Sequence, residues 1–296
     1  MMHREFMRTI TAEDRRALTA KNNLPALLRL TVLLILFIIT SVSILSGVSG
    51  WLIFLPVQGF LLVSLFHLLH ECIHNTPFNS AVLNKFVGSV CGFLLFIPCE
   101  WFRYFHRDHH RFTQIKDKDP ELATDKPQTR SQWILHVTGL PLYKSLAALH
   151  LRLAVKGNVE DFVPGNARSP VINQVRISSV VYALLLCLNI ITGSTVLFWV
   201  WLLPLFIGQP FLRLYLLAEH TLCEHSDNMF ENTRTVLTNP VIRWFTWNMP
   251  YHTEHHIYPA VPFHKLPVLH KRMQQFLVNK DTSYTEFNRH LYQTLK

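Results

Sequence analysis

Three short clusters of histidine dominate the chemistry that this sequence could perform. They are His70-Glu71-Cys72-Ile73-His74, His106-Arg107-Asp108-His109-His110 and His252-Thr253-Glu254-His255-His256. Histidines three or four residues apart lie on one face of a helix, with about 5–6 Å between their Cβ atoms, so two imidazoles can reach one metal ion. The eight clustered histidines therefore predict metal binding.

The number of these histidines indicates two metal ions. One tetrahedral zinc site takes about four ligands, whereas two ions with four or five nitrogen ligands each would use the eight clustered imidazoles and one more. His220 and His225 are the candidates for the ninth ligand. His220 is favoured, because a helix that continues from Arg213, just after the charge-free segment 177–212, carries it directly out of that segment. Imidazole suits Fe, Cu, Zn and Ni, so the ligand type leaves the element open.

Acidic residues stand inside or beside each histidine cluster, namely Glu71, Asp108, Glu219, Glu224 and Glu254. We expect them to orient imidazole N–H groups and to balance the charge of the metal ions, since such outer carboxylates are common around ligating histidines. Ordinary solvated charge is the alternative interpretation. No catalytic residue beyond the metal centre is predicted.

The composition indicates a membrane protein. Of the 296 residues, 49% are hydrophobic and only 16% are charged, with a formal net charge of +9, whereas about 25% of residues in soluble domains are charged. Nucleic-acid-binding proteins are also basic but are not usually so apolar, so no nucleic acid is expected as a partner. The five cysteines are scattered and form no C-x-x-C pair, which argues against a cysteine-based metal site.

Two long segments without any charged residue, 30–70 and 177–212, must position the histidines. As one helix, the 41 residues of the first segment would extend about 60 Å, twice the thickness of the hydrocarbon core. Turn signals divide both segments, at Ser46-Gly47-Val48-Ser49-Gly50 and at Thr192-Gly193-Ser194. The sequence therefore predicts an all-α integral membrane protein with four transmembrane helices in two hairpins, 30–70 and 171–217, and a helical cytoplasmic cap that holds a dimetal site.

The charge distribution predicts the orientation of a single domain over residues 1–296. Lys and Arg are concentrated outside the hairpins, which places both termini and the histidines in the cytoplasm. The expected order is a cytoplasmic segment 1–29, the first hairpin, a cytoplasmic segment 71–170, the second hairpin and a cap 218–296. Since all clusters must meet on one side, the 14-residue apolar stretch 86–99 is expected to be an interfacial helix that does not cross.

Two other metal-dependent functions fit the sequence poorly. His70-Glu71-Cys72-Ile73-His74 matches the H-E-x-x-H pattern of zinc proteases, but such an enzyme does not need six further clustered histidines. A metal transporter or sensor would place ligands along its membrane helices, and apart from His70 of the first cluster the predicted hairpins contain only His67, near one end. Both alternatives are set aside.

The order and surroundings of the clusters resemble the membrane fatty acid desaturase superfamily, in particular its bacterial members. The resemblance runs from about His67 to His270. Its motifs are His74-Asn75, His109-His110-Arg111-Phe112-Thr113, Asp119-Pro120-Glu121-Leu122, Ala218-Glu219-His220, Asn232-Thr233-Arg234-Thr235 and the segment from Asn248 to Pro259.

This resemblance implies a non-haem di-iron centre in a multi-pass protein of the bacterial inner membrane, with O2 as co-substrate. The implied ligands are His70, His74, His106, His109, His110, His220, His252, His255 and His256, and His225, Glu71, Asp108, Glu219, Glu254 and Asn75 are additional or supporting candidates. Six other histidines are expected to be ordinary, namely His3, His136, His150, His264, His270 and His290, and the role of His67 stays open.

The reaction implied by the resemblance is the O2-dependent introduction of a C=C bond into the acyl chain of a membrane lipid or acyl substrate. A hydroxylase or oxygenase acting on a lipid, alkane or carotenoid could use the same site and stays open as the alternative. The sequence has no haem, iron–sulfur or dinucleotide-binding motif, so a separate ferredoxin or cytochrome is the expected electron donor. Basic residues that could dock an acidic donor or contact anionic lipid headgroups are Arg103, Arg107, Arg111, Lys116 and Lys118.

Overall fold

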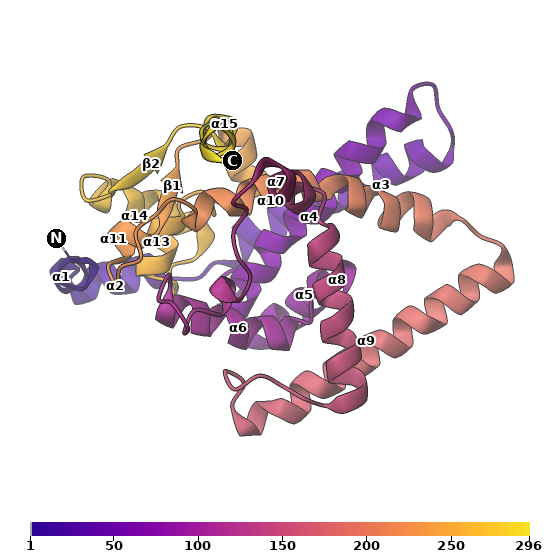
Figure 1. Cartoon of the computed structure of the whole chain (residues 1–296), viewed down its shortest axis with the longest axis horizontal. Helices are drawn as coiled ribbons and strands as arrows, with labels where there is room; N and C mark the ends of the chain where they lie inside the picture. Colours follow the sequence, from indigo (N-terminus) through magenta and orange to yellow (C-terminus); the bar gives the residue numbers. More distant parts are fainter. Residues whose placement is uncertain (1) are drawn as a thin grey trace.

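The computed structural model describes residues 2–296, and these residues are mostly helical (Figure 1). The α-helices are α1 (His3–Thr9), α2 (Ala12–Thr19), α3 (Asn23–Leu45), α4 (Phe54–Ile73), α5 (Ala81–Leu94), α6 (Cys99–Phe112), α7 (Arg130–Val137), α8 (Leu140–Leu151), α9 (Gly165–Thr192), α10 (Leu203–His220), α11 (Met229–Asn232), α12 (Pro240–Phe245), α13 (His252–Ile257), α14 (Leu266–Met273) and α15 (Tyr284–Thr294). Short 3-10 turns are η1 (Trp51–Ile53), η2 (Pro120–Ala123) and η5 (Phe263–Lys265), π-helical turns are η3 (Arg152–Lys156) and η4 (Phe198–Leu202), and the strands are β1 (Arg234–Val236) and β2 (Asn279–Asp281).

Four helical segments are long and apolar enough to cross a membrane, which confirms the predicted number. They are Ala12–Leu45, Trp51–Ile73, Gly165–Thr192 and Phe198–His220. Both predicted turns separate neighbouring segments. Both connections lie on the right of Figure 1, apart from each other, while α11, α13 and α14 lie at the opposite end. The apolar segments and the polar elements thus occupy different ends of the molecule.

Helices α4 and α10 form the centre of the apolar part, and glycine lets their backbones touch. A Cβ atom on Gly59 of α4 would lie 2.3 Å from the carbonyl oxygen of Pro204, and one on Gly208 of α10 would lie 2.3 Å from the carbonyl oxygen of Gly59. Small residues permit such close helix pairs in membranes, where packing replaces the hydrophobic effect. This contact fixes the two helices that carry His70 and His220 in their last turns.

A buried polar side chain joins α4 to its neighbours within the apolar part. The Gln58 amide donates to the Ser41 hydroxyl of α3 at 3.1 Å and to the Val200 carbonyl of η4 at 2.6 Å. Interhelical hydrogen bonds of this kind stabilise membrane helix bundles. Helix α9, by contrast, diverges from α10 in Figure 1 and exposes large apolar residues such as Ile177, Leu184 and Ile191, so the second helix pair is open.

Helices α5 and α6 together form a bent pair. Their axes differ by 99°, and Gly92 allows the chain to turn, because a Cβ there would lie 2.3 Å from the Ile97 carbonyl oxygen. The predicted interfacial stretch 86–99 is therefore divided between the end of α5 and the turn into α6. The bend directs α6 and its three clustered histidines toward the end of α4.

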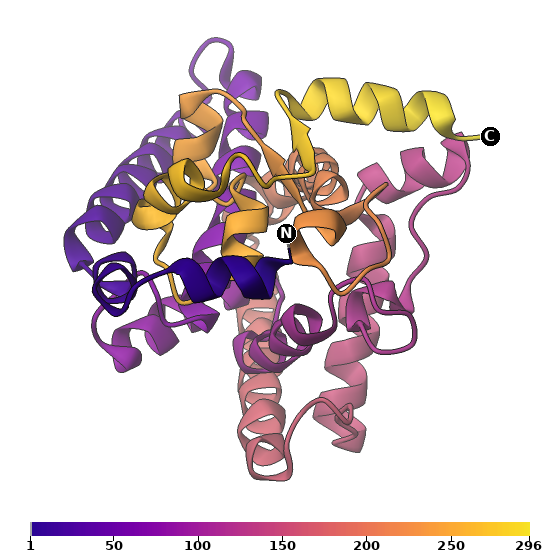
Figure 2. The same cartoon turned by 90° about the vertical axis from the view of Figure 1, so that its left-hand side faces the viewer.

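The N-terminal and C-terminal parts of the chain cover the polar end together. Figure 2 shows α1 and α2 lying across this end, against the C-terminal half of the chain. The Phe6 ring packs against Phe230 at 6.0 Å and Phe276 at 5.8 Å between centroids, and Asp14 of α2 pairs with Arg272 of α14 at 2.7 Å. The parallel strands β1 and β2, paired from Arg234 with Asn279, complete the layer.

Candidate metal centre

Four helices bring the predicted histidines together. His70 lies in the last turn of α4 and His74 directly follows this helix, α6 carries the second cluster, α10 ends with His220, and the short helix α13 carries the third cluster. Of the nine predicted ligands, His74 is partly buried and the others are buried. The site thus forms inside the protein, at the cap end of the two central helices.

The first group of imidazoles comprises His70, His74, His106, His110 and His255, whose ligand atoms all lie within 4.8 Å of one another. The Nε2 atoms of His70 and His106 are 2.6 Å apart, those of His106 and His110 are 2.9 Å apart, and those of His110 and His255 are 3.1 Å apart. The Nδ1 atoms of these four rings are buried and have no hydrogen-bond partner. Packing alone orients these rings.

The second group comprises His109, His220 and His256, with His252 beside them. The Nε2 atom of His220 lies 3.2 Å from that of His109 and 3.0 Å from that of His252, and its ring centroid is 4.9 Å from that of His256. The two groups adjoin, since the His110 and His256 rings are stacked with their centroids 4.1 Å apart. The nine imidazoles thus form two adjoining groups.

Hydrogen bonds outside the second group fix the protonation of its rings. Nδ1 of His220 lies 3.0 Å from the Asn232 carbonyl oxygen, which can only accept, so Nδ1 carries the proton and Nε2 has a free lone pair. Nδ1 of His109 donates to Asp119 at 2.9 Å, and Nδ1 of His256 donates to the Thr113 hydroxyl at 3.2 Å.

These facing nitrogens fit a pair of metal ions. A single proton can bridge one pair of lone pairs, but it cannot satisfy four or five imidazoles that converge on one point. A divalent cation between them would satisfy all of these nitrogens together, and neutral imidazole is the form that binds metal. The residues present therefore fit the predicted metal site.

Burial and neighbouring carboxylates shift the pKa values of the histidines in opposite directions. Burial lowers the pKa of His74 to about 3 and lowers the pKa of His110, His255 and His256 well below the usual value. Burial acts on His109 too, but the carboxylates of Glu121 and Asp119 outweigh it and raise the pKa of His109. Protonation of the His109 ring is therefore favoured, whereas protonation of the buried rings of the first group is disfavoured. A metal ion can bring positive charge into the first group because it forms bonds to these neutral rings.

Some acidic residues within the clusters contact the scaffold instead of the imidazoles. Glu71 accepts hydrogen bonds from the Thr76 hydroxyl at 2.6 Å and from the Phe263 backbone at 3.1 Å. Glu254 accepts from the Thr235 hydroxyl at 2.6 Å and pairs with His270 at 2.5 Å. His270, expected to be ordinary, thus anchors the third cluster.

Three other acidic residues contact the rings. Of these three, the sequence indicates only Glu219 for this role. Glu219 lies 3.2 Å from Nδ1 of His252, whereas Asp108 has no ion pair in the part of the chain described. Instead, Asp119 contacts His109, and Glu121 lies 3.8 Å from Nε2 of the same ring. Both residues belong to the Asp-Pro-Glu-Leu motif that follows the second cluster, which was the only signal available for them.

The remaining supporting candidates lie beside the centre. His225 is exposed, and its Nδ1 lies 3.1 Å from the Gln114 carbonyl oxygen, away from the converging nitrogens. Asn75 adopts a left-handed conformation (φ 58°), and its backbone N–H donates to the Cys72 carbonyl, which ends α4. Between the two candidates for a ninth ligand, the geometry brings only His220 into contact with the other rings.

Residues in the left-handed conformation recur where the chain leaves or enters the centre. Gln114 (φ 61°) follows α6, Leu222 (φ 62°) follows α10, and Trp247 and Asn248 (φ 54° and 58°) precede α13. Each such non-glycine residue costs on the order of 1–3 kcal/mol and persists only where its surroundings enforce it. The strain is concentrated around the histidine clusters, where the chain must turn back sharply after each ligand.

A buried arginine connects the turn after α10 to the C-terminal elements. Arg234, in the Asn232-Thr233-Arg234-Thr235 motif, donates to the carbonyl oxygens of Ala218 and Thr221 at 2.7 Å each and pairs with Asp281 of β2 at 2.8 Å. Its guanidinium lies 4.5 Å from the Phe287 ring of α15. The end of α10 and the C-terminal elements are thereby connected at one point.

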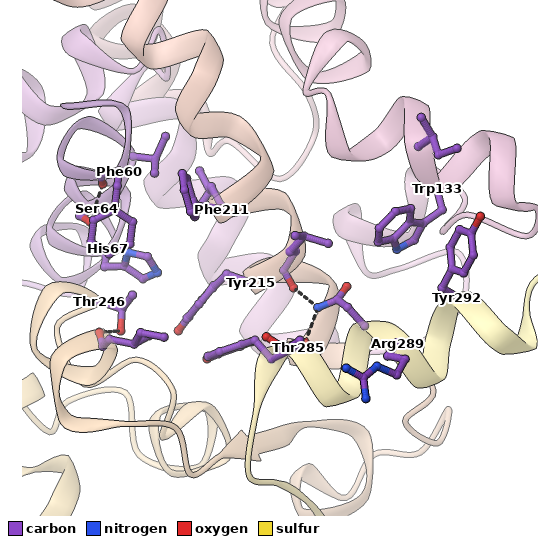
Figure 3. Close-up of a pocket in the computed structure, with 17 residues that line it drawn as sticks. Phe60, Ser64, His67, Trp133, Phe211, Tyr215, Thr246, Thr285, Arg289 and Tyr292 are labelled. Atoms are coloured by element: carbon purple, nitrogen blue, oxygen red, sulfur yellow. Dashed lines mark hydrogen bonds between the residues drawn. The ribbon is translucent and has the colours of Figure 1, made fainter. Parts of the chain in front are cut away.

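An apolar cavity of about 800 Å³ lies beside α4 and α10, the two helices that carry His70 and His220 (Figure 3). Its walls come from α4, α7, α10, α12 and α15 and include Phe60, Phe211, Leu212, Ile134 and Ile242. His67 precedes His70 by three residues and Tyr215 precedes His220 by five residues, and both line the cavity. The cavity therefore reaches to within about one helical turn, roughly 5.4 Å, of the metal ligands.

Comparison with known proteins places this arrangement in a family. Residues 15–288 match the family model described as fatty acid desaturase. A sphingolipid delta(4)-desaturase of Drosophila melanogaster is 27% identical over 277 residues, which cover 89% of this chain and 77% of the relative. A desaturase of the same description from Arabidopsis thaliana is 26% identical over 253 residues, 81% of this chain and 69% of the relative. An omega-3 fatty acid desaturase of Vigna radiata is 38% identical over 69 residues, but the match covers only 23% of this chain and 18% of that protein.

The contact of Asp119 with His109 predicts a role in metal retention. Asp119→Asn removes the charge but keeps the shape, and we expect the affinity of the second group for metal to fall about 10- to 100-fold, as for other outer carboxylates. Elemental analysis after dialysis against a chelator measures this loss. Asp108→Asn, at the position just before His109, is the control, and this variant should retain its metal. Equal metal content in the two variants would contradict the role of Asp119.

Proposed function

This chain belongs to the fatty acid desaturase family, and we propose that it is a membrane-bound, O2-dependent di-iron desaturase that introduces a C=C bond into an acyl chain. The observation that carries the proposal is the convergence of nine imidazoles in two adjoining groups beside an apolar cavity. The family implies a lipid substrate, and relatives are described as sphingolipid and acyl-lipid desaturases.

We assign the two groups of histidines to two iron ions. His70, His74, His106, His110 and His255 would hold one ion, and His109, His220, His252 and His256 would hold the other. Together with O2, the bound ions would supply the oxidising power to remove hydrogen from an unactivated C–H bond, which no protein side chain can do. Iron is compatible with an all-imidazole ligand set.

The protein's own contribution is to position the chain and to exclude water. The cavity walls are apolar and aromatic, so an alkyl chain is held by burial of its surface. Because α4 and α10 carry both the cavity wall and the ligands His70 and His220, a chain in the cavity lies at a fixed height below the centre. Proximity of this kind accelerates a reaction by replacing random encounter with a held geometry.

Charge and hydropathy support the proposed orientation. The cap end, with both chain termini, carries most of the Lys and Arg residues, whereas the two turns on the opposite side carry none. By the positive-inside rule we place the cap, and therefore the metal centre, in the cytoplasm, and we propose the bacterial inner membrane as the location.

The proposed electron donor is a separate ferredoxin or cytochrome that docks on α6. This helix directs His106, His109 and His110 inward and exposes Arg107 and Arg111 on its outer face. The exposed Lys116 and Lys118 follow in the next loop, while Arg103 donates to the Ile73 carbonyl at 2.6 Å and has a structural role. A donor on this face would approach the metal centre across one helix.

The charged face of α6 predicts salt-sensitive electron transfer. Replacing Arg107, Arg111, Lys116 and Lys118 by Glu should slow reduction by an acidic ferredoxin at least tenfold at low ionic strength, because steering charges act mainly on the association rate. Stopped-flow absorbance measures the rate. Rates of the unmodified protein that do not change between low and high salt would contradict docking at this face.

The products formed in a host membrane test the reaction itself. Expression of the chain should yield fatty acyl chains two hydrogen atoms lighter than their precursors, measured by mass spectrometry. The same host with His255→Ala is the control and should lack them. Products that gain one oxygen atom would instead identify the hydroxylase alternative, and unchanged lipids in a host that supplies ferredoxin and O2 would contradict the proposal.

Iron content tests the ligand assignment. The purified chain should bind close to two iron ions, and His220→Ala should lower that number toward one because the second group loses its central ring. His225→Ala, which removes a neighbouring exposed histidine, should retain both ions. Elemental analysis provides the measurement, and a content near one in the unmodified protein, or equal losses in the two variants, would contradict the assignment.

A further inference from the structure

Three carboxylates lie beside the imidazoles of the second group, and one of them differs from the others in the nitrogen that it approaches. Asp119 bonds to Nδ1 of His109 at 2.9 Å, and Glu219 lies 3.2 Å from Nδ1 of His252. Both of these nitrogens are on the side of the ring away from the converging Nε2 atoms. Glu121, by contrast, lies 3.8 Å from Nε2 of His109. Its carboxylate is therefore on the side of the ring that faces the metal position.

Glu121 also lies where the two groups of histidines adjoin. A carboxylate oxygen of Glu121 and one ring nitrogen each of His106 and His109 all lie within 4.8 Å of one another. His106 belongs to the first group and His109 to the second. Among the described residues, Glu121 is the only acidic residue that forms such a cluster with the histidines. Its carboxylate thus adjoins both metal positions.

The loop after α6 holds Glu121 at this position. Asp119, which bonds to the outer side of His109, precedes the turn η2 and accepts hydrogen bonds from the Gln114 N–H at 2.8 Å and the Glu121 N–H at 2.9 Å. In the part of the chain described, the Glu121 carboxylate has no hydrogen bond and no ion pair with Lys or Arg. The backbone of Glu121 is therefore fixed, while its carboxylate oxygens are free to bind a cation.

The distance from Glu121 to His109 suits two ligands of the same ion. Nitrogen and oxygen ligands bind a divalent ion such as zinc at about 2.0–2.2 Å, so two ligands of one ion lie at most about 4.3 Å apart. The 3.8 Å between Glu121 and Nε2 of His109 is within this limit. The second group also has four imidazoles where the first has five. One further ligand would make the two groups equal in number.

The charge of Glu121 is the second reason to assign it to the metal. Imidazoles bind metal in their neutral form, so nine of them leave the positive charge of two buried ions without compensation. Uncompensated charge in a region without water is costly. A carboxylate that contacts the ions directly would remove part of this cost.

We propose that Glu121 is a carboxylate ligand of the metal centre, bound at the junction of the two groups to the ion that His109 holds. This inference rests on the proposed di-iron centre and adds a ligand to it. Glu121 completes the second group as a set of four imidazoles and one carboxylate. Sites that combine histidines with a carboxylate are known to hold non-haem iron.

Two substitutions at position 121 separate a ligand from a nearby negative charge. Glu121→Gln and Glu121→His both remove the charge, but only histidine can bind iron strongly in place of the carboxylate. We expect the affinity for the second iron ion to fall about tenfold or more in Glu121→Gln, and to return to within about threefold of the unmodified value in Glu121→His. Competition with a chelator, followed by elemental analysis of the full-length protein in nanodiscs, measures the affinity.

Mössbauer spectroscopy at iron saturation gives a second readout, which does not depend on turnover. With both ions reduced and O2 absent, Glu121→His should change the signal of at least one ion, because the signal responds to the ligand set. Asp117→Asn is the matched control, because it removes one negative charge from an exposed residue of the same loop, where asparagine tolerates the left-handed backbone (φ 63°). It should retain both ions and the unmodified spectrum.

The possible outcomes separate this ligand from the proposed function. The Glu121 side chain is 29% exposed, so both variants should fold, and thermal unfolding verifies this. Full iron affinity in Glu121→Gln, equal losses in Glu121→Gln and Glu121→His, or an unmodified spectrum in Glu121→His would overturn the assignment.

Two results would overturn the proposed function instead. An unmodified chain that binds no iron would overturn the di-iron centre. A chain that binds two iron ions but forms no unsaturated product would overturn the desaturase reaction and leave Glu121 as a ligand.

Discussion

Repulsion between the lone pairs of buried imidazoles is the constraint to which the rest of this structure responds. Nε2 atoms such as those of His70 and His106 lie 2.6 Å apart in a region from which water is excluded. Removing every ring from water is costly, and neighbouring imidazoles alone return little of that cost. The surrounding elements hold these rings together from four helices that are far apart in the sequence.

The two groups are held in different ways. In the second group, His109, His220 and His256 each have an outer partner that fixes the proton on Nδ1. In the first group the Nδ1 atoms of His70, His106, His110 and His255 lack partners, so these rings depend on packing between the ends of α4, α6 and α13. The carboxylates of Glu71 and Glu254 support that packing by fastening the first and third clusters to the backbone at Phe263 and to His270. The left-handed residues after α4, α6 and α10 have the same purpose, because each lets the chain reverse immediately after a ligand.

Much of this could be predicted from the sequence, because the strongest signals were local. The charge-free segments and their turns gave the four apolar helices, and histidine spacing identified the rings that converge. The outer contacts could not be predicted in the same way. Asp108 lies within a cluster but, among the described residues, has no ion pair or side-chain hydrogen bond with a ring, whereas Asp119, ten residues after His109, bonds to that ring because a loop returns to it. The open angle between α9 and α10 also had no local signal, since it depends on which neighbours each helix finds.

Helices α4 and α10 connect the metal centre to the cavity mechanically. Their backbones touch at Gly59 and Gly208, and on each helix a cavity residue lies within five positions of a predicted ligand. The distance from the cavity to the centre is therefore set by helix geometry, which varies little. The opposite wall is formed by α7, α12 and α15, which carry no ligand. Changes in that wall could alter which chain is bound without moving the centre, whereas a change at His67 or Tyr215 acts directly beside it.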